Sequence, residues 1–128
     1  YQRENSLIPS IINSIRNNNK FEFKYPYDAN DFINIVDLIN IIKISIVKKI
    51  PSGEYNVGFG KTYENIFILN LLRGLISKNK SFPDILPKKI YKYNKNNFFA
   101  DITKTSRIFK FRPKIDIKQG IELIINEK

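Results

Sequence analysis

The sequence lacks cysteine, histidine, methionine and tryptophan altogether. Without cysteine the chain can form neither a disulfide framework nor a thiolate metal site. Without histidine it lacks the commonest metal ligand and general base, so zinc chemistry and histidine-dependent catalytic triads are excluded. The chain also begins at Tyr1 rather than at a methionine, and we interpret it as one piece of a longer protein.

Long apolar runs are scarce too. The best candidate, residues 33–50, falls short of the ~20 consecutive apolar residues that a membrane-spanning helix needs. It is interrupted by polar and charged residues at Asp37, Asn40, Lys43, Lys48 and Lys49. The first residues do not have the basic and apolar pattern of a signal peptide. We therefore expect a soluble, cytoplasmic protein with no membrane partner.

A formal net charge of +10 raises nucleic acid as a partner, because lysine and arginine neutralise phosphates. The basic residues are mostly lysine, and they are spread along the chain among abundant asparagine and isoleucine, as an AT-rich genome favours. A dedicated nucleic-acid binder more often clusters arginine with exposed aromatic side chains. The composition therefore disfavours a nucleic-acid-binding module, which we keep as a third hypothesis.

The first half of the chain predicts helices and short strands within one domain, since 128 residues are too few for two ordinary ones. Apolar residues at helical spacing follow Ser6 and end at residues 17–19. Residues 21–24 and 31–35 are expected to form short strands, with a turn at 25–28. Residues 36–49 are apolar around the whole circumference of a helix, which therefore needs a covering layer that this chain does not supply.

The second half predicts a strand at residues 54–57, followed by a helix that Thr62 caps and that runs to about residue 78. Residues 81–97 are expected to form a long surface connection with a short strand near 90–91. Asp101 or Thr103 is expected to cap a short helix through residues 107–109. Asp116 is expected to cap the last helix.

Gly58-Phe59-Gly60-Lys61-Thr62 partly matches the phosphate-binding loop G-x-x-x-x-G-K-[ST]. The first glycine of that pattern would fall on Tyr55, and the buried strand that leads into such a loop would have to contain Pro51, Ser52 and Gly53. Without the first glycine the backbone N–H groups cannot converge on a phosphate. We interpret this segment as a turn and not as a nucleotide-binding loop.

Several short motifs recur in an order that resembles one known family. In chain order they are Leu7-Ile8-Pro9, Asp31-Phe32, Ile35-Val36-Asp37, Tyr55-Asn56-Val57-Gly58-x-Gly60, Ala100-Asp101-Ile102-x-Lys104, Phe109-x-Phe111-x-Pro113-Lys114 and Asp116-Ile117-Lys118-Gln119-Gly120. Their order and spacing resemble the C-terminal part of extended short-chain dehydrogenases/reductases. These are the NAD(P)-dependent nucleotide-sugar epimerases, dehydratases and 4-keto reductases.

The resemblance implies an α/β fold in which residues 1–128 are the C-terminal, substrate-binding portion of a Rossmann-type enzyme. It implies NAD or NADP as the cofactor of the full-length protein and a nucleotide sugar as its substrate. The dinucleotide fingerprint and the catalytic Tyr-x-x-x-Lys pair would lie in a missing N-terminal Rossmann half, so we expect no cofactor on this chain alone. Tyr91 and Lys95 fit that pair literally, but we discount them because the fingerprint is absent. Family members are often dimers, so a homodimer is a further implied partner.

The same resemblance implies a set of substrate-binding residues. The strand that contains Phe23 and Lys24 would pass the nucleotide base. Asn30 stands where the family has an arginine for the diphosphate, and Tyr91 and Lys92 lie near the place of a second missing arginine. Lys24, Lys92 and Lys95 either replace the lost charge or are ordinary solvated side chains.

Asp37 leaves a similar choice, because it either caps the apolar helix or contacts a ligand. We expect the cap. Because both arginines are missing, a second hypothesis is a non-catalytic remnant of the family that serves as an interaction or regulatory module.

Overall fold

The computed structural model describes residues 6–19, 25–76 and 96–126. The chain divides into two compact units. Unit 1 contains residues 1–29 and 64–96, and unit 2 contains residues 30–63 and 97–128. Among the described residues, no helix is both long enough and apolar enough to cross a bilayer.

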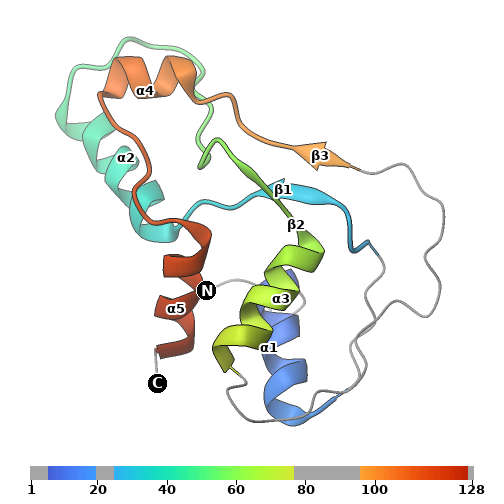
Figure 1. Cartoon of the computed structure of the whole chain (residues 1–128). Helices are drawn as coiled ribbons and strands as arrows, with labels where there is room; N and C mark the ends of the chain where they lie inside the picture. The colour runs from blue at the N-terminus through green and yellow to red at the C-terminus, as the bar shows by residue number, and fades with distance from the viewer. Residues whose placement is uncertain (1–5, 20–24, 77–95, 127–128) are drawn as a thin grey trace. The chain divides into compact units, whose positions relative to one another are not determined.

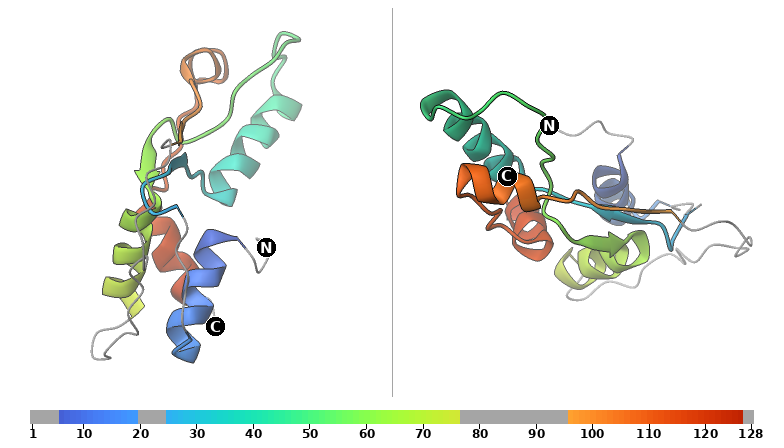
Figure 2. Two further views of the ribbon diagram at one scale, coloured as in Figure 1. Left: turned by 90° about the vertical axis from the view of Figure 1, so that its right-hand side faces the viewer. Right: turned by 90° about the horizontal axis from the view of Figure 1, so that it is seen from above.

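Unit 1 is built on two helices, α1 (Leu7–Asn17) and α3 (Asn65–Ile76), which pack side by side (Figures 1 and 2). Each helix buries one stripe of apolar residues, namely Ile8, Ile11 and Ile12 on α1 and Ile68, Leu69 and Leu72 on α3. Helix α1 ends at Asn18, which adopts the left-handed conformation with φ 53°. The stripe and the end of α1 are as predicted.

A turn holds the start of α3 within unit 1. The backbone N–H of Asn65 donates to the carbonyl of Asp28 at 2.9 Å, and that of Ile66 donates to Pro26 at 2.8 Å. The Asn65 side chain also donates to the carbonyl of Tyr25 at 2.9 Å. The turn predicted at residues 25–28 therefore satisfies the N–H groups that the first turn of a helix leaves unpaired.

A three-stranded sheet joins β1 (Ala29–Asp31), β2 (Thr62–Glu64) and β3 (Asn97–Phe98), with β1 in the centre. The strand predicted at residues 31–35 was wrong in its bounds. The observed strand β1 ends at Asp31, and the chain then continues to α2, which begins at Ile35. The predicted cap at Thr62 was also wrong. Thr62 begins β2, and pairing with β1 delays the start of α3 until Asn65.

Unit 2 contains three helices, α2 (Ile35–Val47), α4 (Thr103–Phe109) and α5 (Ile117–Asn126). Helices α2 and α4 are in contact (Figure 2). The cap predicted for α5 is confirmed as a reciprocal pair: the N–H of Gln119 donates to Asp116 Oδ1 at 2.9 Å, and the N–H of Asp116 donates to Gln119 Oε1 at 3.1 Å. The cap predicted at Asp101 or Thr103 was wrong in position, because the N-cap of α4 is Ile102, which makes no side-chain cap bond. Asp101 lies one residue earlier, and its Oδ1 accepts from the N–H of Thr103, the first residue of α4, at 2.9 Å.

The strand predicted at residues 54–57 was wrong, because that segment pairs with no strand among the described residues. Its carbonyls instead accept hydrogen bonds from side chains of α4. Lys104 Nζ donates to the carbonyl of Glu54 at 2.8 Å, and Thr105 Oγ1 donates to that of Asn56 at 2.6 Å. The segment that was predicted as a strand is therefore held in place by two side chains of α4.

Candidate functional site

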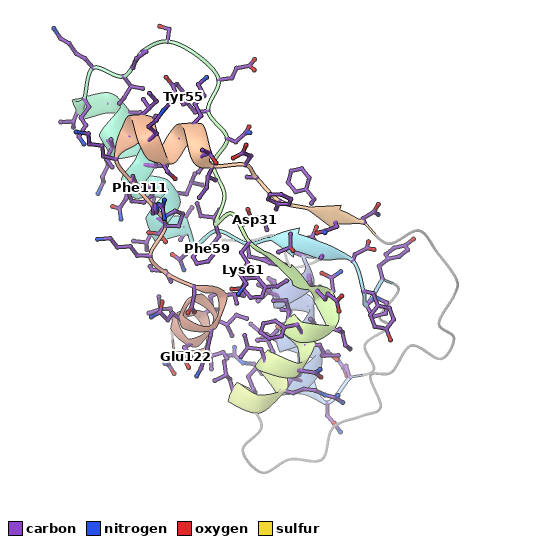
Figure 3. All side chains as sticks on the ribbon, turned by 45° about the horizontal axis from the view of Figure 1, so that its top comes forward. Asp31, Tyr55, Phe59, Lys61, Phe111 and Glu122 are labelled. Atoms are coloured by element: carbon purple, nitrogen blue, oxygen red, sulfur yellow. The ribbon has the colours of Figure 1, made fainter. Side chains whose placement is uncertain are left out.

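The carboxylate of Asp31 joins three segments of unit 2 that are distant in sequence (Figure 3). Its Oδ1 accepts from the backbone N–H of Phe59 at 2.7 Å. Its Oδ2 accepts from the N–H of Gly60 at 2.9 Å and from that of Ala100 at 3.2 Å. The end of β1, the turn at residues 58–60 and Ala100, which follows β3, therefore meet at one side chain. We call this contact the Asp31 junction.

The two glycines of the turn are required by this junction. A Cβ atom on Gly58 would lie 2.5 Å from Asp31 Oδ2 and 2.7 Å from the Cβ of Ala100, closer than atoms can approach. Gly60 has φ +78°, a conformation that residues with a side chain rarely adopt. The turn is shaped around a carboxylate of the protein itself, and it leads into a strand, not into the helix N-terminus of a phosphate-binding loop.

Asp37 forms a second junction. It is only 2% exposed, and its Oδ2 accepts from the N–H groups of Lys114 at 2.8 Å and Ile115 at 2.9 Å. The prediction that Asp37 caps α2 was wrong, since the cap is Asn34, whose Oδ1 accepts from the N–H of Val36 at 2.9 Å. A carboxylate on a largely apolar helix was the signal for this role, because a buried charge has to be paired.

The ring of Tyr55 connects residues 54–57 to α4. It meets the ring of Phe109 edge-on, with centroids 5.1 Å apart and planes at 76°. Lys104 Nζ lies 4.6 Å from the centre of the Tyr55 ring, in a cation–π arrangement. The Tyr55 hydroxyl donates to the carbonyl of Pro51 at 2.7 Å.

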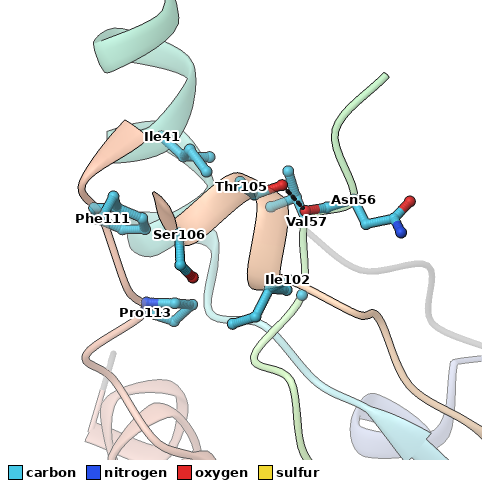
Figure 4. Close-up of a pocket in the computed structure, with 9 residues that line it drawn as sticks. Ile41, Asn56, Val57, Ile102, Thr105, Ser106, Phe111 and Pro113 are labelled. Atoms are coloured by element: carbon cyan, nitrogen blue, oxygen red, sulfur yellow. Dashed lines mark hydrogen bonds between the residues drawn. The ribbon is translucent and has the colours of Figure 1, made fainter. Parts of the chain in front are cut away.

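One hollow of unit 2 lies where these segments meet (Figure 4). Its lining includes Ile41, Val57, Ile102, Phe111 and Pro113. The cavity volume is about 10 Å³, close to the smallest space that holds one water molecule. It is therefore a small gap in the packing around α4 and far too small for a nucleotide.

Asp101 is the one described group with a clearly altered acidity. Hydrogen bonds from the side chain and then from the backbone N–H of Thr103 hold the pKa of Asp101 below its ordinary value of 3.8. The group is fully exposed and ionised at neutral pH, so it has the properties of a helix-start acceptor and not of a catalytic acid. Within residues 6–19, 25–76 and 96–126, no cluster of three acidic side chains could hold a metal ion.

Of the predicted substrate-binding residues, only Asn30 lies in the described part of the chain. It is the middle residue of β1, half-buried, between β2 and β3. Phe23, Lys24, Lys92 and Lys95 lie outside the described residues. Their grouping with Asn30 therefore stays a prediction.

Sequence reasoning missed Asp28, which lies in unit 1 two residues before Asn30. Asp28 Oδ1 accepts from the N–H of Asn96 at 3.1 Å, and the N–H of Ala29 donates to the carbonyl of Asn96 at 2.8 Å. The residue just before β3 is thus tied to the residue just before β1. Because the two residues are 68 positions apart, no local pattern predicts this contact.

No protein-family model matches the sequence, and no curated protein matches it. Solved structures do match. The dTDP-glucose 4,6-dehydratase from Bacillus anthracis in complex with NAD matches 99% of this chain and 41% of its own, with a TM-score of 0.77 at 19% identity. The UDP-glucose 4-epimerase from Thermotoga maritima with UDP-glucose matches 92% of this chain and 37% of its own, with a TM-score of 0.75 at 15% identity.

The Bordetella bronchiseptica enzyme WbmG in complex with NAD matches 91% of this chain with a TM-score of 0.72 at 21% identity. The chain spans 36% of the length of WbmG, so these enzymes are well over twice as long as this chain. The chain therefore has the fold of the matching part of extended short-chain dehydrogenases/reductases. The predicted α/β fold and the predicted resemblance are confirmed at the level of the fold.

Proposed function

We propose that this chain is the C-terminal, substrate-binding part of an NAD(P)-dependent nucleotide-sugar epimerase, dehydratase or 4-keto reductase. The observation that carries the proposal is the fold match over 91–99% of this chain to three NAD-dependent or nucleotide-sugar enzymes. In this proposal the dinucleotide fingerprint and the catalytic Tyr-x-x-x-Lys pair belong to a preceding half of the protein. The chain alone then has no complete active site and binds no NAD.

The contacts of the motif residues support this division of labour. Asp31, Asp37, Gly58 and Lys104 bind other parts of unit 2, so their roles are to hold the fold. The substrate-binding role then falls to Asn30 together with Phe23, Lys24, Lys92 and Lys95.

The lost diphosphate contact can be tested with UDP, which WbmG holds together with NAD in a second solved structure. Isothermal titration of this chain with UDP is expected to give weak binding, because Asn30 offers a neutral amide in place of a guanidinium. Asn30→Arg is expected to tighten UDP binding by about tenfold, the effect of one charge-assisted hydrogen bond of ~1.5 kcal/mol.

Asn70→Arg is the matched control, since Asn70 is exposed on α3 and the substitution adds the same charge. It should leave the affinity for UDP unchanged. Equal tightening by the two variants would mean that net charge alone attracts UDP and would count against a site at Asn30. Tight, stoichiometric binding of NAD would contradict the absence of the cofactor half.

The second candidate function is a non-catalytic interaction or regulatory remnant of the same family. Asn30 in the place of a phosphate-binding arginine favours it, since affinity for a diphosphate would fall. The adjacent upstream coding sequence distinguishes the two functions. An intact glycine fingerprint and a Tyr-x-x-x-Lys pair there would dismiss the remnant.

A further inference from the structure

Residues 107–114 carry the densest run of positive charge in the described part of the chain. The segment holds four basic side chains, all of them exposed: Arg107, Lys110, Arg112 and Lys114. No aspartate or glutamate lies between Asp101 and Asp116. We propose that these four side chains, which we call the cation row, bind the phosphate backbone of a nucleic acid regardless of its base sequence. This inference goes beyond the proposed function and does not rest on it.

The basic and apolar side chains of this segment have different surroundings, because exposure alternates along residues 110–115. Phe111, Pro113 and Ile115 are half-buried, whereas the basic side chains that alternate with them are exposed. Phe111 and Pro113 line the hollow of unit 2 (Figure 4). The apolar side chains therefore hold the segment against unit 2, and the cations face the solvent.

Both ends of the segment are fixed. The buried carboxylate of Asp37 accepts from the N–H groups of Lys114 at 2.8 Å and Ile115 at 2.9 Å. At the other end, Lys110 is the C-cap of α4. The cation row is therefore presented by a backbone that is held in place before a ligand binds, which lowers the cost of binding.

The end of α4 does not by itself explain the cation row. Lys110 has φ 51°, a left-handed conformation in which glycine is usual, so a lysine stands where glycine would be less strained. The helix dipole favours a cation at this end and accounts for Arg107 and Lys110. It does not account for Arg112 and Lys114, which lie beyond the end of the helix.

The cation row is not neutralised by the part of the protein that the structure describes. Within residues 6–19, 25–76 and 96–126, no ion pair joins any of the four side chains to a carboxylate. The nearest acids in the sequence, Asp101 and Asp116, accept instead from the backbone N–H groups of Thr103 and Gln119. Like charges repel one another, so a partner that carries several negative charges would relieve this repulsion.

The surroundings of the cation row select the kind of anion. A peptide strand would need backbone N–H groups, but Pro113 has none and those of Lys114 and Ile115 already donate to Asp37. A membrane surface would take up apolar side chains from between the cations, and these are turned toward the hollow. A nucleic-acid backbone needs neither, because it offers one charge per nucleotide to basic side chains alone.

The spread of lysine along the chain disfavours nucleic acid as a partner of the whole surface, and the structure limits the proposal to one segment. Fluorescence anisotropy of this chain with labelled oligouridine and with labelled single-stranded DNA of mixed sequence tests it. The two affinities should be similar, because phosphate contacts carry no sequence information. The logarithm of the binding constant should fall with the logarithm of the salt concentration with a slope of about −3, roughly −0.7 for each of four phosphate contacts.

A matched pair of variants locates the site. Arg112→Gln should weaken binding about fivefold at low salt and reduce the slope by about 0.7, because one phosphate contact is lost. Arg16→Gln on α1 removes the same charge from an exposed position outside the cation row and should leave both quantities unchanged. Since both arginines are exposed, each variant should keep the circular dichroism spectrum of the parent chain.

Equal weakening by the two variants would mean that net charge alone attracts the oligonucleotide, and it would overturn the inference. Absence of binding at low salt would overturn it too, as would equal binding of polyglutamate or of vesicles that contain anionic lipid. Excess UDP should not displace the oligonucleotide, and displacement would place the nucleic acid at the proposed substrate site instead. A chain that binds UDP through Asn30 but binds no oligonucleotide keeps the proposed function and loses the cation row as a binding site.

Discussion

Removal of the Asp31 carboxylate is the most direct test of the structural role assigned to it. Asp31→Ala deletes three acceptor contacts, to the N–H groups of Phe59, Gly60 and Ala100. The three bonds are partly exposed, so water can replace the lost acceptor in part, and each counts for about 1 kcal/mol. The expected loss in the free energy of unfolding is therefore roughly 3 kcal/mol, which is large for a single domain.

The two oxygens of Asp31 make the test more specific. Asn has one oxygen, which can keep the bonds to Gly60 and Ala100 while its NH₂ group faces the N–H of Phe59. Asp31→Asn should thus cost about 1–2 kcal/mol, between the wild type and the alanine variant. Asp28→Ala is the matched control. It removes the same charge, but among the described residues the carboxylate of Asp28 accepts two exposed hydrogen bonds, both from Asn96, so its cost should be smaller, about 1–2 kcal/mol.

Urea unfolding followed by circular dichroism gives the free energies, and amide hydrogen exchange reports each bond directly. In the alanine variant the amides of Phe59, Gly60 and Ala100 should exchange faster than those of α3, which lies in the other unit. Equal destabilisation by Asp31→Ala and Asp28→Ala would refute the reasoning. So would unchanged exchange at the three amides.

Three further substitutions probe the same framework. Gly58→Ala should destabilise the protein by roughly 2 kcal/mol or more, because the new Cβ atom would lie 2.5 Å from Asp31 Oδ2. Gly74→Ala should stabilise it by about 0.5–1 kcal/mol, because no atom lies within 4 Å of the new Cβ atom and alanine favours a helix. Urea unfolding measures both changes. Asp37→Ala should cost about 3 kcal/mol in the same assay, since it leaves two N–H groups without their buried acceptor. Because the folded-state pKa of Asp101 is lowered, its contribution to stability is present above pH 3.8 and disappears as the pH falls through the folded pKa. The Thr103 amide resonance should therefore titrate with a midpoint below 3.8, and a midpoint at or above it would contradict the hydrogen bond.

Local signals predicted the parts of the structure that depend on local physics. The apolar stripe after Ser6 predicted α1, and the Asp116 acceptor predicted the start of α5, because stripes and caps are set within one or two helical turns. The cap assigned to Thr62 failed because pairing with β1 extended the chain there, and no local pattern reports on a strand partner more than 30 residues away.

The candidate site depended on contacts between distant residues. Asp31 and Ala100 are 69 positions apart, and Asp37 and Lys114 are 77 positions apart, so their hydrogen bonds could not be derived from spacing. The motif order suggested that these residues belong together but not what they do. The structure adds that their side chains bind backbone N–H groups of the same unit.

The Asp31 junction has an evolutionary consequence. Four motif residues, Asp31, Asp37, Gly58 and Lys104, hold parts of unit 2 together, so a descendant that lost its chemistry would still need them in order to fold. Asn30, directly beside Asp31 on β1, makes none of these three hydrogen bonds, so the role proposed for it is separate from the role of the carboxylate that holds unit 2 together.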